Sequence, residues 1–312
     1  MTIKAQRGNQ LRTKGWRQEA ILRLLENVLE NAEDPDNLIV YGALGKAARD
    51  WSSYEAIVES LKTIEEDESL IIQSGKPIGI LKTHPDAPLV IMANSNLVGK
   101  WATSENFYDL YDKNLIAWGG LTAGDWQYIG SQGVIQGTYE IFKSISRLYF
   151  SDDLSGRLIL TAGMGGMGGS QPLAAKMAGA NIIVVDVNED NIDKRLSIGY
   201  VDKKTDSLDQ ALSWIDDAKR KGENVSIAVI GNAATVYQDI LDRGIVPDIV
   251  SDQTAAHDLL YGYVPEGYSL EEVIQVRQSN PKKLESDAGA SIAKEVRAIL
   301  SFQNKGAKVF DN

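Results

Sequence analysis

The segment from residue 157 to residue 187 most constrains how this chain can fold. Three glycines, Gly163, Gly165 and Gly168, follow an apolar run directly and fit the spacing G-x-G-x-x-G. In such a loop the first glycine permits a tight turn, the second lets the backbone approach a pyrophosphate, and the third lets the following helix pack closely on the strand. The segment therefore predicts a strand, a phosphate-binding loop, a helix and a second strand, in the sequence RLILTAGMGGMGGSQPLAAKMAGANIIVVDV.

An acidic residue follows the glycine loop at a fitting distance. Asp186 ends the second apolar run, 23 residues after Gly163, close to the roughly 20 expected for an acid that binds ribose hydroxyls. A carboxylate there would repel a 2′-phosphate, so the sequence favours NAD over NADP. The alternative is a helix–strand contact rich in small residues, followed by an ordinary aspartate at a strand end.

The remainder of residues 130–312 alternates short apolar runs with amphipathic ones. Continuous apolar strands between helices are typical of a parallel sheet that is covered on both faces. We therefore expect a Rossmann-like α/β domain, with strands at 157–163, 181–187, 225–231 and 247–253, another strand close to the end of the sequence, and helices at 171–180, 207–222, 232–244, 269–278 and 294–306.

The N-terminal part has a different composition. Five of the six tryptophans lie in the first 126 residues, which marks a boundary near residue 130. Hydrophobic periodicity predicts a mixed α/β domain over residues 1–129, with helices at 16–32 and 46–64 and strands at 38–41, 69–73, 77–82 and 88–94.

Composition excludes several classes of function. The net charge of −11 disfavours binding to nucleic acid, because like charges repel the phosphate backbone. The chain has no cysteine and only two histidines, so we expect no disulfide, no thiolate zinc site and no histidine-rich metal site. No apolar run reaches the roughly 18 residues of a transmembrane helix, and the first residues have no apolar core of a signal peptide. We expect a cytoplasmic protein without membrane contact.

Four further residues have both a structural and a functional interpretation. Asn232 opens a helix at a strand end, where it could contact a cofactor ring or simply cap the helix. His257 lies in the polar run DQTAAHD after another strand and could carry a proton, bind a ligand or anchor the loop. His84 and Tyr41 lie on loops, where either could be a site residue or tether the loop through one hydrogen bond.

Several longer strings extend these observations to nearly the whole chain. In sequence order, and with a specificity that generic nucleotide-binding domains lack, they resemble the urocanase (urocanate hydratase) family: YGALGKAARDW, LIIQSGKPIGILKTHPDAPLVIMANSNLVGKWA, LTAGDWQYIGSQGVIQGTYEIF, LTAGMGGMGGSQPLAAKMAGA, GNAA and SDQTAAHDLLYGYVPEGY. The resemblance implies a core domain joined to an NAD-binding domain, in a cytosolic homodimer of histidine degradation. It also implies hydration of urocanate to imidazolonepropionate, with tightly bound NAD⁺ as an electrophile and no net redox change.

Site residues are carried over from the family one position at a time. The catalytic candidates in this chain are Tyr41, His84 and Thr122. The cofactor contacts implied by the resemblance, together with Gly163 and Gly165 of the loop motif, are Gly42, Gly166, Met167, Gly168, Asp186, Asn232, Ala233, Gln253, Thr254, Ala255, Ala256, His257, Tyr263 and Val264.

The sequence departs from the family pattern at four positions. Ala43, Gly120, Asn191 and Asn312 stand where the family has a glycine, a glutamine, an arginine and a tyrosine. The loss of the glutamine side chain and of the arginine charge would weaken the grip on the cofactor, or would fit a paralogue that acts on a substituted urocanate.

The resemblance also implies a further C-terminal segment that returns to the core domain. In the family this segment carries the active-site cysteine and an arginine for the substrate. We therefore expect this chain to be the N-terminal part of such an enzyme, an incomplete core followed by the NAD domain, and to be inactive alone. Two alternatives remain: an NAD-dependent dehydrogenase with His257 as its general acid and base, and a catalytically inert NAD-binding fragment.

Overall fold

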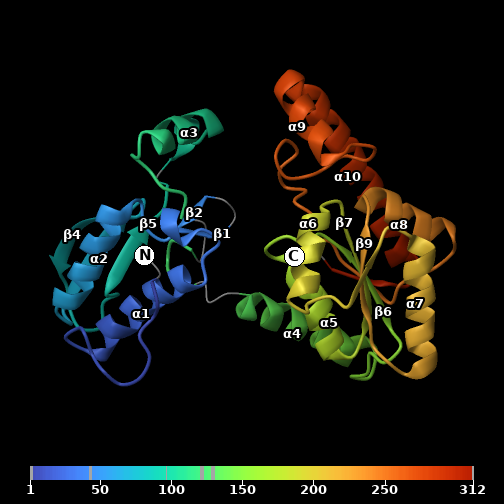
Figure 1. Cartoon of the computed structure of the whole chain (residues 1–312), viewed down its shortest axis with the longest axis horizontal. Coiled ribbons are helices and arrows are strands. Elements are labelled where there is room, and N and C mark those ends of the chain that lie inside the picture. Colours follow the sequence, from blue (N-terminus) through green and yellow to red (C-terminus); the bar gives the residue numbers. More distant parts are fainter. Residues whose placement is uncertain (1–2, 42–43, 96, 120–122, 128–130, 311–312) are drawn as a thin grey trace. The chain divides into compact units, whose positions relative to one another are not determined.

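A computed structural model describes residues 3–41, 44–95, 97–119, 123–127 and 131–310. The chain divides into two compact units, Met1–Gly133 and Val134–Asn312, and the elements of each can be followed in Figure 1. Within the described residues, no helix combines the length and the apolar composition that spanning a bilayer requires.

The first unit is a mixed α/β domain. Strand β3 lies at the centre of a three-stranded sheet, antiparallel to β4 and parallel to β5, and a separate antiparallel pair is formed by β1 and β2. The elements are α1 (Trp16–Glu30), β1 (Ile39–Tyr41), β2 (Gly45–Lys46), α2 (Trp51–Thr63), β3 (Glu68–Gln73), β4 (Lys76–Lys82), β5 (Val90–Ala93) and α3 (Ser104–Asp112), with 3₁₀ turns at Pro35–Asn37 and Gly99–Trp101.

Helix α2 begins later than the sequence predicts. Residues Gly45 and Lys46 pair with β1 as a strand, so the helix starts only at Trp51. The side chain of Asp50 caps it by accepting a hydrogen bond from the backbone N–H of Ser53 at 2.8 Å. Local pairing of the chain before the helix has therefore overridden the helical periodicity of residues 46–50.

The second unit contains a six-stranded parallel sheet in the order β11-β10-β6-β7-β9-β8, which confirms the predicted Rossmann-like class. Its elements are α4 (Gln132–Tyr149), β6 (Leu158–Ala162), a 3₁₀ turn (Gly168–Ser170), α5 (Gln171–Ala178), β7 (Asn181–Asp186), α6 (Glu189–Ser197), β8 (Lys203–Thr205), α7 (Leu208–Lys221), β9 (Ser226–Ile230), α8 (Ala233–Asp242), β10 (Ile249–Val250), α9 (Leu270–Ser279), α10 (Pro281–Asn304) and β11 (Lys308–Val309).

Helix α10 and strand β10 differ in extent from the sequence prediction, and the prediction includes neither α4 nor β8. Helix α10 begins at Pro281, well before the predicted start at 294, with Asn280 as its cap and proline at its first position. Strand β10 covers only two residues, although Ser251 and Gln253 continue its backbone hydrogen bonds to β6 by donating to Leu160 and Ala162 at 3.0 and 2.9 Å.

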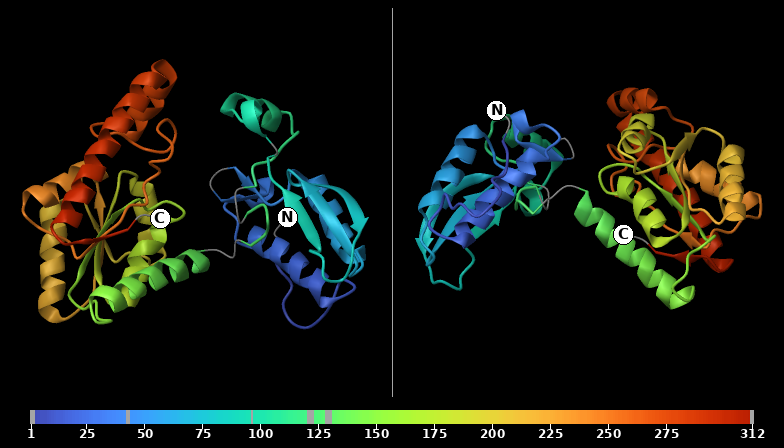
Figure 2. Two further views of the ribbon diagram at one scale, coloured as in Figure 1. Left: turned by 180° about the vertical axis from the view of Figure 1, so that it is seen from behind. Right: turned by 60° about the horizontal axis from the view of Figure 1, so that its bottom comes forward.

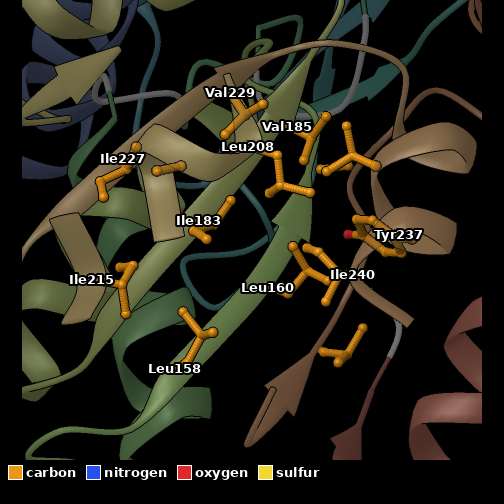
Figure 3. Close-up of a cluster of buried hydrophobic side chains, with 14 of the residues drawn as sticks. Leu158, Leu160, Ile183, Val185, Leu208, Ile215, Ile227, Val229, Tyr237 and Ile240 are labelled. Atoms are coloured by element: carbon orange, nitrogen blue, oxygen red, sulfur yellow. The ribbon is translucent and has the colours of Figure 1, made fainter. Parts of the chain in front are cut away.

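Both faces of the parallel sheet are covered by helices, as Figures 1 and 2 show. Because successive side chains of a strand point to opposite faces, Leu158 and Leu160 join Ile183 and Val185 on the face covered by α7, α8 and α10 (Figure 3). Ile159 and Ile182 pack on the other face, against residues of α4, α5 and α6. The central strands therefore carry apolar residues on both faces, which explains the nearly continuous hydrophobic runs of the sequence.

The strand order locates the point where a ligand can enter. From β6 the chain adds β7, then β8 at the far edge and β9 between β7 and β8, and it then crosses to the other side of β6 to add β10 and β11. In open parallel sheets such a reversal leaves a crevice outside the carboxyl ends of the two strands that flank it. Here those strands are β6 and β10.

Truncating the central strand should reveal how much the second unit depends on this core. Leu160→Ala removes a fully buried side chain and should lower the free energy of unfolding by about 2–5 kcal/mol. Leu148→Ala is the matched control, because that side chain is 73% exposed, and it should change stability by less than about 0.5 kcal/mol. Chemical denaturation of both variants measures the difference; equal losses would contradict the burial of Leu160.

Candidate functional site

A cleft of about 490 Å³ lies at the carboxyl ends of the parallel strands. This volume falls in the range of sites for small molecules and cofactors. Its walls come from the glycine loop after β6, the ends of β7 and β9, the loop after β10, and helix α9: Gly163, Gly165, Val185, Asp186, Val187, Asn188, Asn191, Gly231, Asn232, Ala233, Gln253, Thr254, Ala255, Tyr261, Gly262, Tyr263, Val264, Leu270, Val273, Ile274 and Arg277.

The first and last glycines of the loop are required by close backbone contacts. Gly163 has φ +84°, and a Cβ atom there would lie 2.3 Å from the carbonyl oxygen of Gln253. A Cβ atom on Gly168 would lie 2.0 Å from the carbonyl oxygen of Gly163. Only glycine fits either position, since real Cβ atoms do not approach other atoms so closely. Gly168 is therefore a packing residue of the turn, as the motif predicts for the third glycine.

The middle of the loop is open instead. A Cβ atom added at Gly165 or at Gly166 would meet no atom within 4 Å. Packing within the protein therefore does not require glycine at either position. Gly165 lines the cleft, whereas Gly166 and Met167 are exposed outside its described walls. The backbone at Gly165 can thus be approached by a ligand, which is the role that the motif assigns to the second glycine.

Asp186 lies at the end of β7 with its carboxylate turned toward the glycine loop. The carboxylate accepts hydrogen bonds from the backbone N–H of Met164 at 2.5 Å and of Asn188 at 2.7 Å. Asn191, at the position where the family resemblance implies an arginine, hydrogen-bonds to it through its side chain. Burial raises the pKa of Asp186 above its usual value, and these three hydrogen bonds partly offset that effect.

An arginine that sequence reasoning missed binds the backbone of the glycine loop. Arg195 of α6 donates from Nη2 to the carbonyl oxygen of Gly165 at 2.8 Å and from Nε to that of Met164 at 3.4 Å. It also occupies the space beside Gly169, where a Cβ atom would lie 2.0 Å from its Nε. In the sequence, Arg195 looks like any basic residue near a helix end, so no local signal distinguishes it.

Asn232 fulfils both roles that the sequence leaves open to it. Its Oδ1 accepts the backbone N–H of Ala234 at 3.0 Å, so it caps helix α8. Its Nδ2 donates to the carbonyl oxygen of Val264 at 2.9 Å, and the residue also lines the cleft. The cap thereby ties the end of β9 to the segment that carries Tyr263.

The loop after β10 is organised by its own hydrogen bonds. The carboxylate of Asp252 accepts from the backbone N–H and the hydroxyl of Thr254, at 2.9 and 2.7 Å. That of Asp258 accepts from the backbone N–H of Leu260 and Tyr261, at 3.0 and 2.8 Å. Such turns built on aspartate side chains fix the loop locally.

The predicted contacts in this loop fall into two groups. Gln253, Thr254 and Ala255 lie on the wall of the cleft. Ala256 and His257 do not belong to the wall, and His257 is exposed. The structure therefore brings together the first three of the five residues carried over from the family.

Helix α9 supplies a wall that sequence reasoning also missed. Leu270, Val273 and Ile274 present an apolar surface to the cleft. Arg277 places a positive charge beside this surface. Its Nε donates a hydrogen bond to the carbonyl oxygen of Leu260 at 2.7 Å, and its Cζ lies 4.8 Å from the ring centre of Tyr261, within range of a cation–π interaction. The amphipathic pattern of residues 269–278 predicts the helix, but it does not predict that the helix lines the cleft.

The remaining candidates belong to the first unit. Tyr41 ends β1 and is half-buried, and His84 is exposed in the turn after β4, where its carbonyl oxygen accepts the N–H of Ala87 at 2.9 Å. Gly42 and Thr122 lie outside the described residues, as do three of the positions that depart from the family, Ala43, Gly120 and Asn312.

The fold and the cleft define the class of protein. A parallel sheet with a glycine turn after β6, an acid after β7 and a cleft at the topological switch point is a Rossmann-like domain of the kind that binds nucleotide cofactors. Comparison with protein families makes the assignment specific. The urocanase Rossmann-like domain matches residues 130–312, and the urocanase N-terminal domain matches residues 3–127. The chain belongs to the urocanase family.

The contacts of Arg195 predict a measurable effect on the glycine loop. Arg195→Met keeps an unbranched apolar stem but removes both hydrogen bonds to the loop carbonyls, which should cost about 1–2 kcal/mol of stability. The amide of Gly169, which donates to the carbonyl oxygen of Gly165 at 3.0 Å, should exchange its hydrogen faster. Lys194→Met, at the exposed neighbouring residue, is the control, and exchange at Gly169 that is equal in the two variants would contradict the role of Arg195.

Proposed function

We propose that this chain forms the NAD-binding part of a hydratase of the urocanate hydratase type. In this reaction water adds to urocanate, a small imidazole acrylate, and gives imidazolonepropionate in histidine degradation. The observation that carries the proposal is the cleft itself, in which an approachable glycine loop and the Asp186 carboxylate meet within a domain of the urocanase family.

The residues of the cleft fit a dinucleotide. The open space at Gly165 suits a pyrophosphate, which needs close approach to backbone N–H groups. Asp186 is already fixed by two backbone N–H groups and can accept from ribose hydroxyls with its remaining lone pairs. The apolar side chains of α9 offer a surface against which a flat ring can pack.

Each of these groups has a defined task when the cofactor is bound. Bound NAD⁺ supplies an electron-poor nicotinamide ring that serves as an electron sink for the imidazole of the substrate. The glycine loop and Arg195 fix the phosphate end, Asp186 fixes a ribose, and the loop at Gln253–Ala255 forms the opposite wall. These residues would thus hold the cofactor in one orientation.

The competing dehydrogenase hypothesis receives less support from the site. It requires a general acid and base beside the nicotinamide, and His257 was the candidate for that role. Its side chain is exposed, and the wall of the cleft includes Ala255 but not His257. The residue that the dehydrogenase hypothesis requires thus lies off the wall of the cleft, which favours the hydratase.

The first prediction from this proposal concerns the choice of cofactor. The protein should bind NAD at least about tenfold more tightly than NADP, because the Asp186 carboxylate would face the additional phosphate. Asp186→Ala should weaken the binding of NAD by about tenfold or more and reduce the difference between the affinities for NAD and NADP. Calorimetric titration measures both affinities.

The exposed neighbour Asp190 provides the matched control for that experiment. Asp190→Ala removes one negative charge from the first turn of α6, shortly after Asp186 in the chain, and should leave both affinities unchanged within about twofold. Thermal unfolding of each variant shows whether the fold is retained, since Asp186 also holds the loop. Equal binding of NAD and NADP by the unmodified protein would contradict the assignment of Asp186.

The second prediction separates a hydratase from a dehydrogenase. With NAD and urocanate, a hydratase removes the ultraviolet absorbance of the conjugated acrylate without accumulating NADH, whereas a dehydrogenase produces NADH in step with product. The assay is run on this chain alone and after addition of a separately expressed C-terminal urocanase segment that carries the family cysteine. We expect loss of urocanate absorbance without NADH when the two are combined. Accumulation of NADH, or no loss of urocanate in either arm, would contradict the proposed reaction.

A further inference from the structure

Helix α10 buries a carboxyl group directly behind the wall of the cleft. Glu295 is 2% exposed, and its Oε2 accepts a hydrogen bond from the hydroxyl of Tyr263 at 2.6 Å. Its second oxygen, Oε1, is buried and accepts no hydrogen bond from the residues that the structure describes. Burying an ionised carboxylate with one unsatisfied oxygen costs free energy of folding, so the protonation state of this group affects the stability of the fold.

The surroundings of Glu295 oppose its ionisation. Three titratable groups act with it from the elements around it: Asp252 after β10, Tyr237 of α8, and Tyr263 itself. Burial, together with the nearby carboxylate of Asp252, raises the pKa of Glu295 to about 8, although the hydrogen bond from Tyr263 lowers it. A proton on Oε1 leaves the hydrogen bond from Tyr263 to Oε2 intact and removes the repulsion from Asp252.

Tyr263 connects this buried group to the cleft. The residue is 4% exposed and lines the cleft, while its hydroxyl points away from it toward Glu295. On either side, the carbonyl oxygen of Val264 accepts from Asn232 at 2.9 Å, and a Cβ atom on Gly262 would lie 2.6 Å from the carbonyl oxygen of Ala255. A displacement of Tyr263 would therefore shift a wall that is packed against its neighbours on both sides.

We propose that Glu295 is a positioning residue that holds the Tyr263 wall of the cleft in its protonated form, and that loss of this proton lowers the affinity for the dinucleotide. The proposal rests on the NAD-binding function given above. Ionised Glu295 would be a buried charge beside the carboxylate of Asp252, and the segment around Tyr263 must then move or admit solvent. Glu295 touches no ligand; it acts only through Tyr263.

Substitution of Glu295 by its neutral isostere tests the proposal. The affinity of the unmodified protein for NAD should fall by about tenfold between about pH 6 and about pH 9, through the ionisation of Glu295. Glu295→Gln keeps an oxygen that can accept from Tyr263 but cannot ionise, so its affinity should vary by less than about twofold over that range. Calorimetric titration at each pH measures these profiles.

Two further variants make the result specific. Glu285→Gln, at an exposed position of the same helix, should keep the profile of the unmodified protein. Tyr263→Phe removes the hydroxyl that links Glu295 to the cleft, so its affinity for NAD should also become independent of pH. The same pH dependence in Glu295→Gln as in the unmodified protein would overturn the proposal, and so would an unaltered profile in Tyr263→Phe.

Measurements without cofactor separate this inference from the proposed function. The infrared spectrum at neutral pH should show the C=O stretch of a protonated carboxyl group, lost in Glu295→Gln and retained in Glu285→Gln. In the unfolded chain Glu295 ionises near its usual pKa of about 4.3, whereas the folded chain keeps the proton until about pH 8. The contribution of Glu295 to stability is therefore full below about pH 4 and is lost as pH rises to about 8.

Thermal unfolding of the cofactor-free protein checks that sign. Between about pH 5 and about pH 8, the unfolding temperature of Glu295→Gln should fall less with rising pH than that of the unmodified protein or of Glu285→Gln. If the unmodified protein binds no NAD at any pH, the proposed function fails, while the infrared and unfolding data still decide the state of Glu295. If NAD binds but these data show an ionised Glu295 at neutral pH, this inference alone fails.

Discussion

The close approach of two backbone segments at Gly163 is the constraint on which the second unit depends. A Cβ atom there would lie 2.3 Å from the carbonyl oxygen of Gln253, so β6 and β10 can end side by side only if this residue is glycine. The N–H of Gly163 donates to Val185 at 2.8 Å, and the N–H of Gln253 donates to Ala162 at 2.9 Å. One turn thus joins the ends of β6, β7 and β10, and the cleft lies across the edge that they share.

The charged side chains at this edge are held by hydrogen bonds within the protein itself. Asp186 is largely withdrawn from water, and its carboxylate is satisfied by the N–H groups of Met164 and Asn188. Arg195 binds two carbonyl oxygens of the same loop. The backbone of the loop is therefore held by two side chains, which keeps its shape fixed.

The sequence predicts those parts of the fold that depend on neighbouring residues, and it misses those that depend on distant ones. The strand, loop, helix and strand from Leu158 to Asp186 follow from local periodicity and glycine spacing, and they are confirmed. Arg195, Arg277 and Glu295 escaped notice because their partners lie elsewhere in the chain: Gly165, Leu260 and Tyr263. A basic or acidic residue on an amphipathic helix has the same appearance whether it faces solvent or a buried partner.

The two sides of the cleft are consequently held by different kinds of interaction. On the side of the glycine loop, steric exclusion around Gly163 and Gly168 admits a single backbone path, and no change of protonation alters it. On the side of Tyr263, the wall is held by side-chain hydrogen bonds from Asn232 and to Glu295, each across about 30 residues of chain. The hydrogen bond to Glu295 depends on the charge of its partner, whereas steric contacts do not. The cleft therefore joins an edge fixed by steric contacts to a wall fixed by side-chain hydrogen bonds.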